Sequence, residues 1–133
     1  MENKIKHLEM IQAIITRMAQ NSFMIKGWSL TLVVAMFAFV PKTACLFIPI
    51  AIIPVLIFTC LDAYYLQLER RYRKLYDIVR NKDETEINFQ LKIIEECKTI
   101  SNNYLNCIFS RSILLFYVPI FVVLIGIIIG LFV

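Results

Sequence analysis

Three long apolar runs constrain this chain more than any other feature of its sequence. They cover residues 23–40, 44–66 and 113–133, and a helix of about twenty apolar residues crosses the hydrocarbon core of a bilayer. The first run contains one charged residue, Lys26, the second contains one, Asp62, and the third contains none. The sequence therefore predicts an all-α fold, an integral membrane bundle with three transmembrane helices in a single membrane domain, 1–133.

The polar segments beside these runs have helical periodicity. In residues 1–22, apolar side chains recur at alternating spacings of three and four, which is typical of a coiled-coil seam, and the pattern continues into the first run: Leu8, Ile11, Ile15, Met18, Ser22 and Ile25. We therefore expect a cytoplasmic amphipathic helix over 1–22 that is continuous with the first span.

The region 67–112 is predicted to be helical and cytoplasmic as well. The second span keeps the same spacing beyond its apolar run to about Arg80, through Tyr65, Leu68, Tyr72, Leu75 and Val79. We expect this extension to pair antiparallel with the helix over 1–22. A further amphipathic helix is predicted after residue 84, with one apolar face: Phe89, Ile93, Cys97, Ile100 and Tyr104.

The distribution of basic residues predicts the orientation. Thirteen of the fourteen Lys and Arg residues lie in 1–26 and 70–111, and Lys42 is the other. Basic residues near span ends favour the cytoplasmic side. We therefore expect a multi-pass protein of the inner (plasma) membrane with a cytoplasmic N-terminus and an extracytoplasmic C-terminus.

An alternative topology treats the first two runs as a re-entrant hairpin. Pro49 and Pro54 both fall in the second run, and each proline removes a backbone donor and kinks a helix. A tight turn is predicted at residues 41–43, between the two runs. Because both runs are long enough to cross the bilayer, we favour full spans.

The net charge of +4 does not indicate a nucleic-acid partner. The basic residues flank the predicted spans, where anionic lipid headgroups are a sufficient partner, and seven acidic residues between 69 and 96 largely balance the loop. The four cysteines show no CxxC spacing and His7 is the sole histidine, so we expect no metal site and no cofactor. Without a nucleophile–base pair, a carboxylate pair or a phosphate loop, we expect no catalytic residue and no enzyme activity.

Lys26 and Asp62 are predicted to form a charge pair at the membrane boundary. Counted from residues 41–43 at 1.5 Å per residue, Lys26 lies about 22 Å along the first span and Asp62 about 28 Å along the second. A lysine side chain spans that difference. Charged residues in spans are candidates for function and are usually paired, so both a structural ion pair and a functional contact stay open.

Small residues indicate where helices approach closely. Gly126 and Gly130 form a GxxxG pattern in the third span, and Gly27, Thr31 and Ala35 repeat a small-residue spacing on the first. Such positions allow membrane helices to pack through their backbones. Packing within one chain and assembly of several chains both explain the pattern, and the thin bundle of three spans favours a homo-oligomer.

Two segments resemble a known class of proteins: NSFMIKGWSLTL at 21–32 and LDAYYLQLER at 61–70. They are similar to segments of small, largely uncharacterised bacterial multi-span membrane proteins. Some members of that class resemble membrane effectors of phage-defence systems, in which a compact helical bundle alters membrane permeability. The resemblance covers the first two spans and their extensions, and it implies an antiviral role without a catalytic motif.

Two functions agree with these observations. The first is an oligomeric channel-like or membrane-perturbing effector, a pore-forming protein with Asn21, Ser22 and Lys26 at its inner mouth. The second is a non-enzymatic membrane anchor that docks a cytoplasmic protein partner through residues 66–110. Ion flux through liposomes containing the purified protein separates these functions.

The topology is testable with reporter fusions. We expect a reporter fused after Val133 to be extracytoplasmic and one inserted near Glu84 to be cytoplasmic, because three crossings separate the N-terminus from the C-terminus. Paired alkaline phosphatase and green fluorescent protein fusions measure both positions. Two reporters on the same side of the membrane would contradict the three-span topology.

Overall fold

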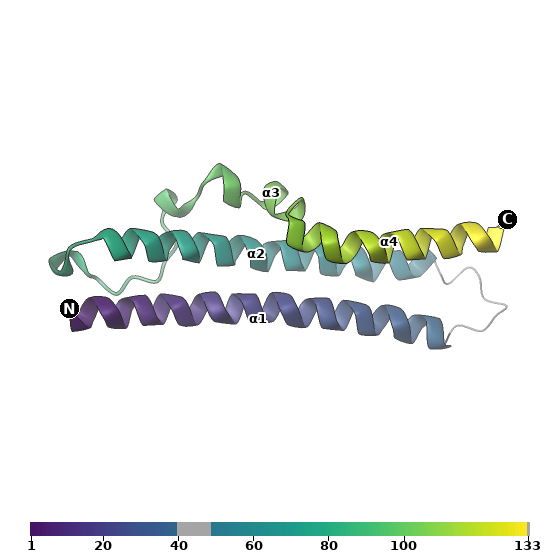
Figure 1. Cartoon of the computed structure of the whole chain (residues 1–133), viewed down its shortest axis with the longest axis horizontal. Helices are drawn as coiled ribbons and strands as arrows, with labels where there is room; N and C mark the ends of the chain where they lie inside the picture. The colour runs from purple at the N-terminus through teal and green to yellow at the C-terminus, as the bar shows by residue number, and fades with distance from the viewer. Residues whose placement is uncertain (40–48, 133) are drawn as a thin grey trace.

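A computed structural model describes residues 1–39 and 49–132 of the protein, and within these ranges the chain is helical and has no strand (Figure 1). The long helices are α1 (Glu2–Phe39), α2 (Ile52–Asn81) and α4 (Arg111–Phe132). Each is long and apolar enough to cross a membrane. The predicted turn at 41–43 lies outside the described residues.

Helix α1 is continuous over 38 residues, which corresponds to about 57 Å. The seam predicted for this helix faces the rest of the protein: Ile11, Ile15, Ser22 and Ile25 are all buried. The buried stripe continues along the same face of the apolar half, through Ser29 and Val33. A single helix therefore runs from the polar N-terminal segment through the first apolar run.

Helix α2 begins after a short 3-10 helix, η2 (Pro49–Ala51). Pro54 is the third residue of α2, and backbone N–H groups in the first turn of a helix have no intrahelical acceptor to lose. Within the described residues, Pro49 therefore precedes α2 and Pro54 lies in its first turn, so neither interrupts the helix itself. The proline inside a helix is Pro119 of α4, which membrane helices tolerate when neighbours satisfy the freed carbonyl.

Helices α1 and α2 lie antiparallel along most of their lengths, as Figure 1 shows, and α4 lies beside the N-terminal half of α2. Direct packing between α1 and α4 is sparse, so α2 is the helix that contacts both others. At the far end of the pair, the Lys4 ammonium donates to the carbonyl of Lys82 at 2.8 Å. The fold therefore has a three-helix apolar half (22–39, 49–66 and 111–132) and a head (2–21 and 67–110).

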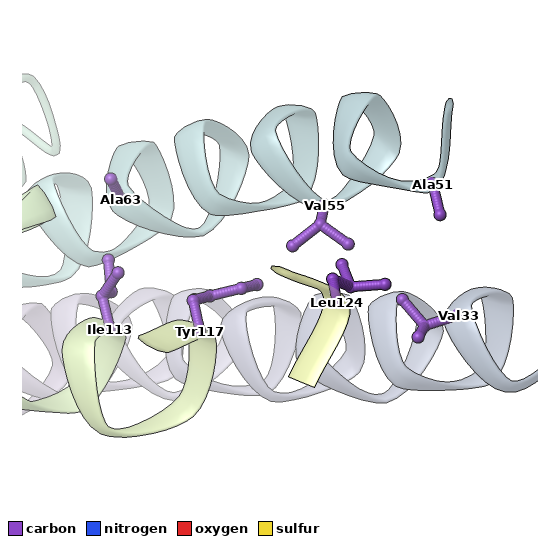
Figure 2. Close-up of a cluster of buried hydrophobic side chains, with 7 residues drawn as sticks. All are labelled: Val33, Ala51, Val55, Ala63, Ile113, Tyr117 and Leu124. Atoms are coloured by element: carbon purple, nitrogen blue, oxygen red, sulfur yellow. The ribbon is translucent and has the colours of Figure 1, made fainter. Parts of the chain in front are cut away.

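Each half has its own buried core. In the apolar half, side chains from all three long helices meet, as Figure 2 shows: Val33, Ala51, Val55, Ala63, Ile113, Tyr117 and Leu124. In the head, α1 and α2 contact each other and the segment that follows α2, through Ile11, Ile15, Leu75, Val79 and Cys97. Between the two cores along α1 and α2 lie Ser22, Lys26 and Asp62, and the membrane boundary was predicted at this level.

The amphipathic helix predicted after residue 84 does not form. The chain there contains 3-10 helices, η3 (Glu84–Glu86), η4 (Glu95–Cys97) and η5 (Ile100–Asn102), followed by the short helix α3 (Tyr104–Ile108). The expected apolar face is divided, because Cys97 is buried whereas Ile100 is 81% exposed.

Side chains in this segment bind the backbone and so compete with a regular helix. The Asn102 amide donates to the carbonyl of Cys97 at 2.6 Å and its oxygen accepts from the Thr99 N–H at 2.9 Å. Asn88 accepts from the N–H of Gln90, next to Phe89, whose φ of 53° lies in the left-handed region. These local hydrogen bonds explain why the apolar spacing did not produce a helix.

The core of the head predicts that alanine substitution of two isoleucines of α1 lowers the free energy of unfolding by very different amounts. Ile11 is fully buried and Ile5 is 51% exposed. We expect Ile11→Ala to lower the free energy of unfolding by about 2–5 kcal/mol, because it leaves a cavity between α1 and α2. Ile5→Ala is the matched control and should cost less than about 0.5 kcal/mol. Denaturation in detergent measures both, and equal losses would contradict the packing of the head.

Candidate functional site

The candidate site is a buried ion pair between α1 and α2. The Lys26 ammonium donates to Oδ2 of Asp62 at 2.5 Å. Asp62 is fully buried and the Lys26 side chain is 16% exposed. The two charges inside the first two apolar runs are thus neighbours. A buried carboxylate is costly unless it is paired and hydrogen-bonded, and Lys26 supplies the pairing.

Ser22 completes the coordination of the carboxylate. Its hydroxyl donates to Oδ1 of Asp62, and it accepts from the Lys26 ammonium at 3.0 Å. Ser22 and Lys26 are one helical turn apart, so α1 presents both to the same point of α2. We call Ser22, Lys26 and Asp62 the Asp62 cluster. Each carboxylate oxygen of Asp62 therefore accepts a hydrogen bond from α1, one from the Ser22 hydroxyl and one from the Lys26 ammonium.

Helix α4 reaches this level through Tyr117. The Tyr117 hydroxyl donates a long hydrogen bond, 3.4 Å, to the carbonyl of Phe58. Phe58 is one turn before Asp62 in α2, and Tyr117 is 2% exposed. All three long helices therefore converge at the Asp62 cluster.

The sequence predicts the pairing of Lys26 with Asp62 but not the roles of Ser22 and Tyr117. Ser22 was assigned to the apolar seam and to a pore mouth, although its position four residues before Lys26 could have indicated a shared acceptor. Tyr117 is a hydroxyl-bearing residue in an otherwise aliphatic and aromatic run. Its partner could not be predicted, because the rotation of α4 depends on tertiary packing.

The polar groups of the Asp62 cluster bind one another, so few of them are free to act on a substrate. The Ser22 proton is directed to a carboxylate that the Lys26 ammonium already neutralises, whereas a nucleophilic serine needs a base that takes its proton and access to a substrate. Deeper in the apolar half, Ser29 is fully buried and its hydroxyl has no partner among the described residues. The described residues contain no group of three or more His, Cys, Asp or Glu side chains that could hold a metal ion.

The three glycines predicted to mediate packing face away from the rest of the described protein. Gly27, Gly126 and Gly130 would each accept a Cβ with no other atom within 4 Å. Thr31 is exposed and donates to the carbonyl of Gly27 at 2.9 Å, and Ala35 is half-buried. The glycines therefore do not serve close packing between the helices that the structure describes.

Helix α3, the last helix of the head before α4, is attached to α2. The Tyr104 hydroxyl donates to the carbonyl of Cys60 at 2.9 Å. Partial burial raises the pKa of Tyr104, and so does the side chain of Cys60 beside it. Burial also raises the pKa of the Cys107 thiol, against the opposing effect of Arg70. In the head, the pKa of the exposed Glu95 is lowered by its hydrogen bond and ion pair with Lys98.

The sole histidine, His7, belongs to the core of the head. It is 1% exposed, its Nε2 lies 2.9 Å from the carbonyl of Gln90, and its ring contacts Phe89 with centroids 5.6 Å apart. His7 thus joins the N-terminal part of α1 to the segment after η3.

No family model, curated protein or solved structure matches the chain.

The Asp62 cluster predicts non-additive mutations. Asp62→Ala should destabilise the protein more than Lys26→Ala with Asp62→Ala does, because the single change strands a charged lysine at the boundary of an apolar half. Lys26→Ala should cost about 3–5 kcal/mol, since the fully buried carboxylate then keeps only Ser22. Unfolding in detergent measures the cycle, and we expect a coupling of at least about 1 kcal/mol. Single losses that simply add would mean that the two residues are not partners.

Proposed function

We propose that this chain is a three-span inner-membrane protein that assembles into a homo-oligomer and acts as a channel-like or membrane-perturbing effector. Its N-terminus and head are cytoplasmic and its C-terminus is extracytoplasmic. The observation that carries the proposal is the outward face of the apolar half, where glycines without neighbours offer sites for a second copy. An antiphage role follows from the resemblance of residues 21–32 and 61–70 to defence effectors.

The glycine faces support assembly, because between helices in lipid there is no hydrophobic driving force for apolar side chains to associate. Helices in a bilayer associate where small residues allow close backbone approach. Gly126 and Gly130 are one turn apart on an exposed face of α4, and Gly27 lies on an exposed face of α1. Since no described residue of the same copy fills the space above them, a helix of another copy is the proposed occupant.

A groove between α1 and α4 supports the same conclusion. It encloses about 300 Å³ and is lined entirely by apolar side chains: Leu30, Val33, Val34, Phe37, Pro119, Ile120, Val123 and Leu124. The groove exists because α1 and α4 each pack on α2 and hardly on each other. Its proximity to the outward glycine of α1 favours a helix of a second copy, and a lipid chain is the competing occupant.

The structure revises the residues expected at the pore mouth. Ser22 and Lys26 point into the α1–α2 interface and bind Asp62, and Asn21 is half-buried. An assembly of copies in this conformation would have an apolar lumen, which conducts poorly because it excludes water. The proposed effector is therefore closed in this state, and opening requires the Asp62 cluster to separate or the outward faces of the helices to move.

The second candidate function is a membrane anchor that docks a cytoplasmic partner through residues 66–110. The observation that favours it is the preformed core of the head, which contains Cys97 from the segment after α2 as well as residues of both long helices. An adaptor needs no ion pathway. Liposomes containing the purified protein and a fluorescent ion indicator distinguish the two functions, since the effector alone releases ions.

The glycine faces provide a test of assembly. We expect Gly126→Leu with Gly130→Leu to reduce the mass of the detergent-solubilised protein from an oligomer toward the 15.6 kDa of one chain, because a branched side chain blocks backbone approach. Light scattering on the purified protein gives the mass. Val118→Leu with Ile125→Leu is the matched control, because it alters exposed apolar side chains of α4 without filling a glycine. Equal masses for the double glycine variant and the wild type would contradict assembly through this face.

A further inference from the structure

We propose that a basic groove in the head binds the phosphodiester of an anionic lipid headgroup. The groove holds about 420 Å³ and lies between α2 and the segment around η5. Arg70, Arg73 and Lys74 line it from α2, and Thr99 and Ser101 line it from the other side. Neither the membrane-effector proposal nor the Asp62 cluster depends on this site.

The three basic residues share one face of α2. Positions 70, 73 and 74 are separated by three and four residues, and helical residues at these spacings are neighbours. Asp77, one turn further along, also lines the groove, and Glu69 pairs with Arg73. Three cations against two acids leave an excess of one positive charge (3 − 2 = 1). That balance suits a monoanion such as a phosphodiester better than a highly charged polyphosphate.

Existing hydrogen bonds orient the arginines and leave donors available. One Nη1 donor of Arg70 reaches the carbonyl of Ser101 at 3.0 Å, which holds the guanidinium across the groove. Arg73 gives Nε and Nη2 donors to Glu69 at 3.0 and 2.7 Å. Since guanidinium carries five N–H donors, both arginines retain some. Lys74 makes no ion pair within the described ranges, 1–39 and 49–132.

The opposite wall supplies hydroxyl groups on a fixed turn. The hydroxyls of Thr99 and Ser101 lie 3.0 Å apart. Reciprocal hydrogen bonds between Thr99 and Asn102 hold the turn, and Asn102 is 3% exposed. Serine and threonine hydroxyls beside arginine and lysine are a donor set that phosphate oxygens accept well.

The position of the groove favours a lipid as the source of the phosphate. Arg70 lies four residues beyond Leu66, where the second apolar run ends, which corresponds to about 6 Å along the helix. The headgroup region on each side of a bilayer is of similar thickness, about 5–7 Å. In the proposed orientation, with the edge of the hydrocarbon core at Leu66, the groove begins at the level of the phosphodiesters of the cytoplasmic leaflet, where anionic lipids attract juxtamembrane basic residues.

Three probes test the site on the full chain purified in a non-ionic detergent. They are short-chain phosphatidylglycerol, short-chain phosphatidylcholine, and glycerophosphoglycerol, which keeps the phosphodiester without acyl chains. Native mass spectrometry counts retained lipids and isothermal titration calorimetry gives the affinities. We expect phosphatidylglycerol to bind in preference to phosphatidylcholine. Binding of glycerophosphoglycerol at a similar affinity would show that the groove accepts the phosphodiester from a soluble source as well.

Variants locate the binding in the groove. Lys74→Gln should weaken phosphatidylglycerol binding about fivefold, and Arg73→Gln with Lys74→Gln about thirtyfold, as expected for surface cations that each attract an anionic lipid. Arg17→Gln with Lys92→Gln is the charge-matched control, since both side chains are exposed and neither lines the groove. Ser101→Ala tests the hydroxyl wall without changing charge and should weaken binding about threefold.

Two results would overturn the proposal. One is equal retention of phosphatidylglycerol and phosphatidylcholine by the wild-type protein. The other is an equal loss of phosphatidylglycerol binding in the groove variants and in the control pair, which would indicate attraction by net charge alone. Because Lys74 is exposed, Lys74→Gln should keep the fold, and an unchanged unfolding temperature verifies this. The oligomer mass and ion flux are measured separately, so failure here leaves the effector proposal intact.

Discussion

The carboxylate of Asp62 imposes the constraint on which the arrangement of the helices depends. A fully buried charge is tolerated only where other groups replace the water it has lost, and Asp62 has no exposed surface. Lys26 and Ser22 provide the replacement from two successive turns of α1. These contacts fix the register between α1 and α2, because sliding either helix by one turn would remove both donors from the carboxylate. Tyr117 adds the third helix at the same level.

The register of α1 against α2 at Asp62 determines how side chains pack on both sides of that residue. Toward the N-terminus of α1 and the C-terminus of α2, the apolar stripe of α1 meets α2 and the segment containing Cys97 to form the core of the head. In the other direction, Val33 and Val55 meet the side chains of α4 (Figure 2). A polar layer thus separates two apolar cores. A layer of this kind resists displacement because a slipped helix would expose apolar residues in the head and charges in the apolar half.

The same arrangement leaves unused surface that bears on the proposed functions. Since α2 contacts both other long helices, the outer faces of α1 and α4 carry glycines that no side chain in 1–39 or 49–132 covers. In the head, the segment after α2 returns along that helix and brings Thr99 and Ser101 opposite three basic side chains. In the proposed functions, the first surface makes close helix contacts within a bilayer, and the second donates hydrogen bonds to an anion at the edge of that bilayer.

The sequence by itself determined the helical class, the three helices long enough to cross a membrane and the buried seam of α1. Periodicity and apolar length are local properties of the sequence, and they do not depend on how the helices pack. It also identified Lys26 and Asp62 as the charges within the first two runs. Tertiary structure decided the rest. Ser22 reaches Asp62 and Tyr117 reaches the carbonyl of Phe58 only because of the relative rotation of the helices. The glycines face outward for the same reason. In residues 84–104, side-chain bonds to the backbone from Asn88 and Asn102 outweighed an apolar spacing typical of a helix, a competition that depends on which contacts the folded head makes available.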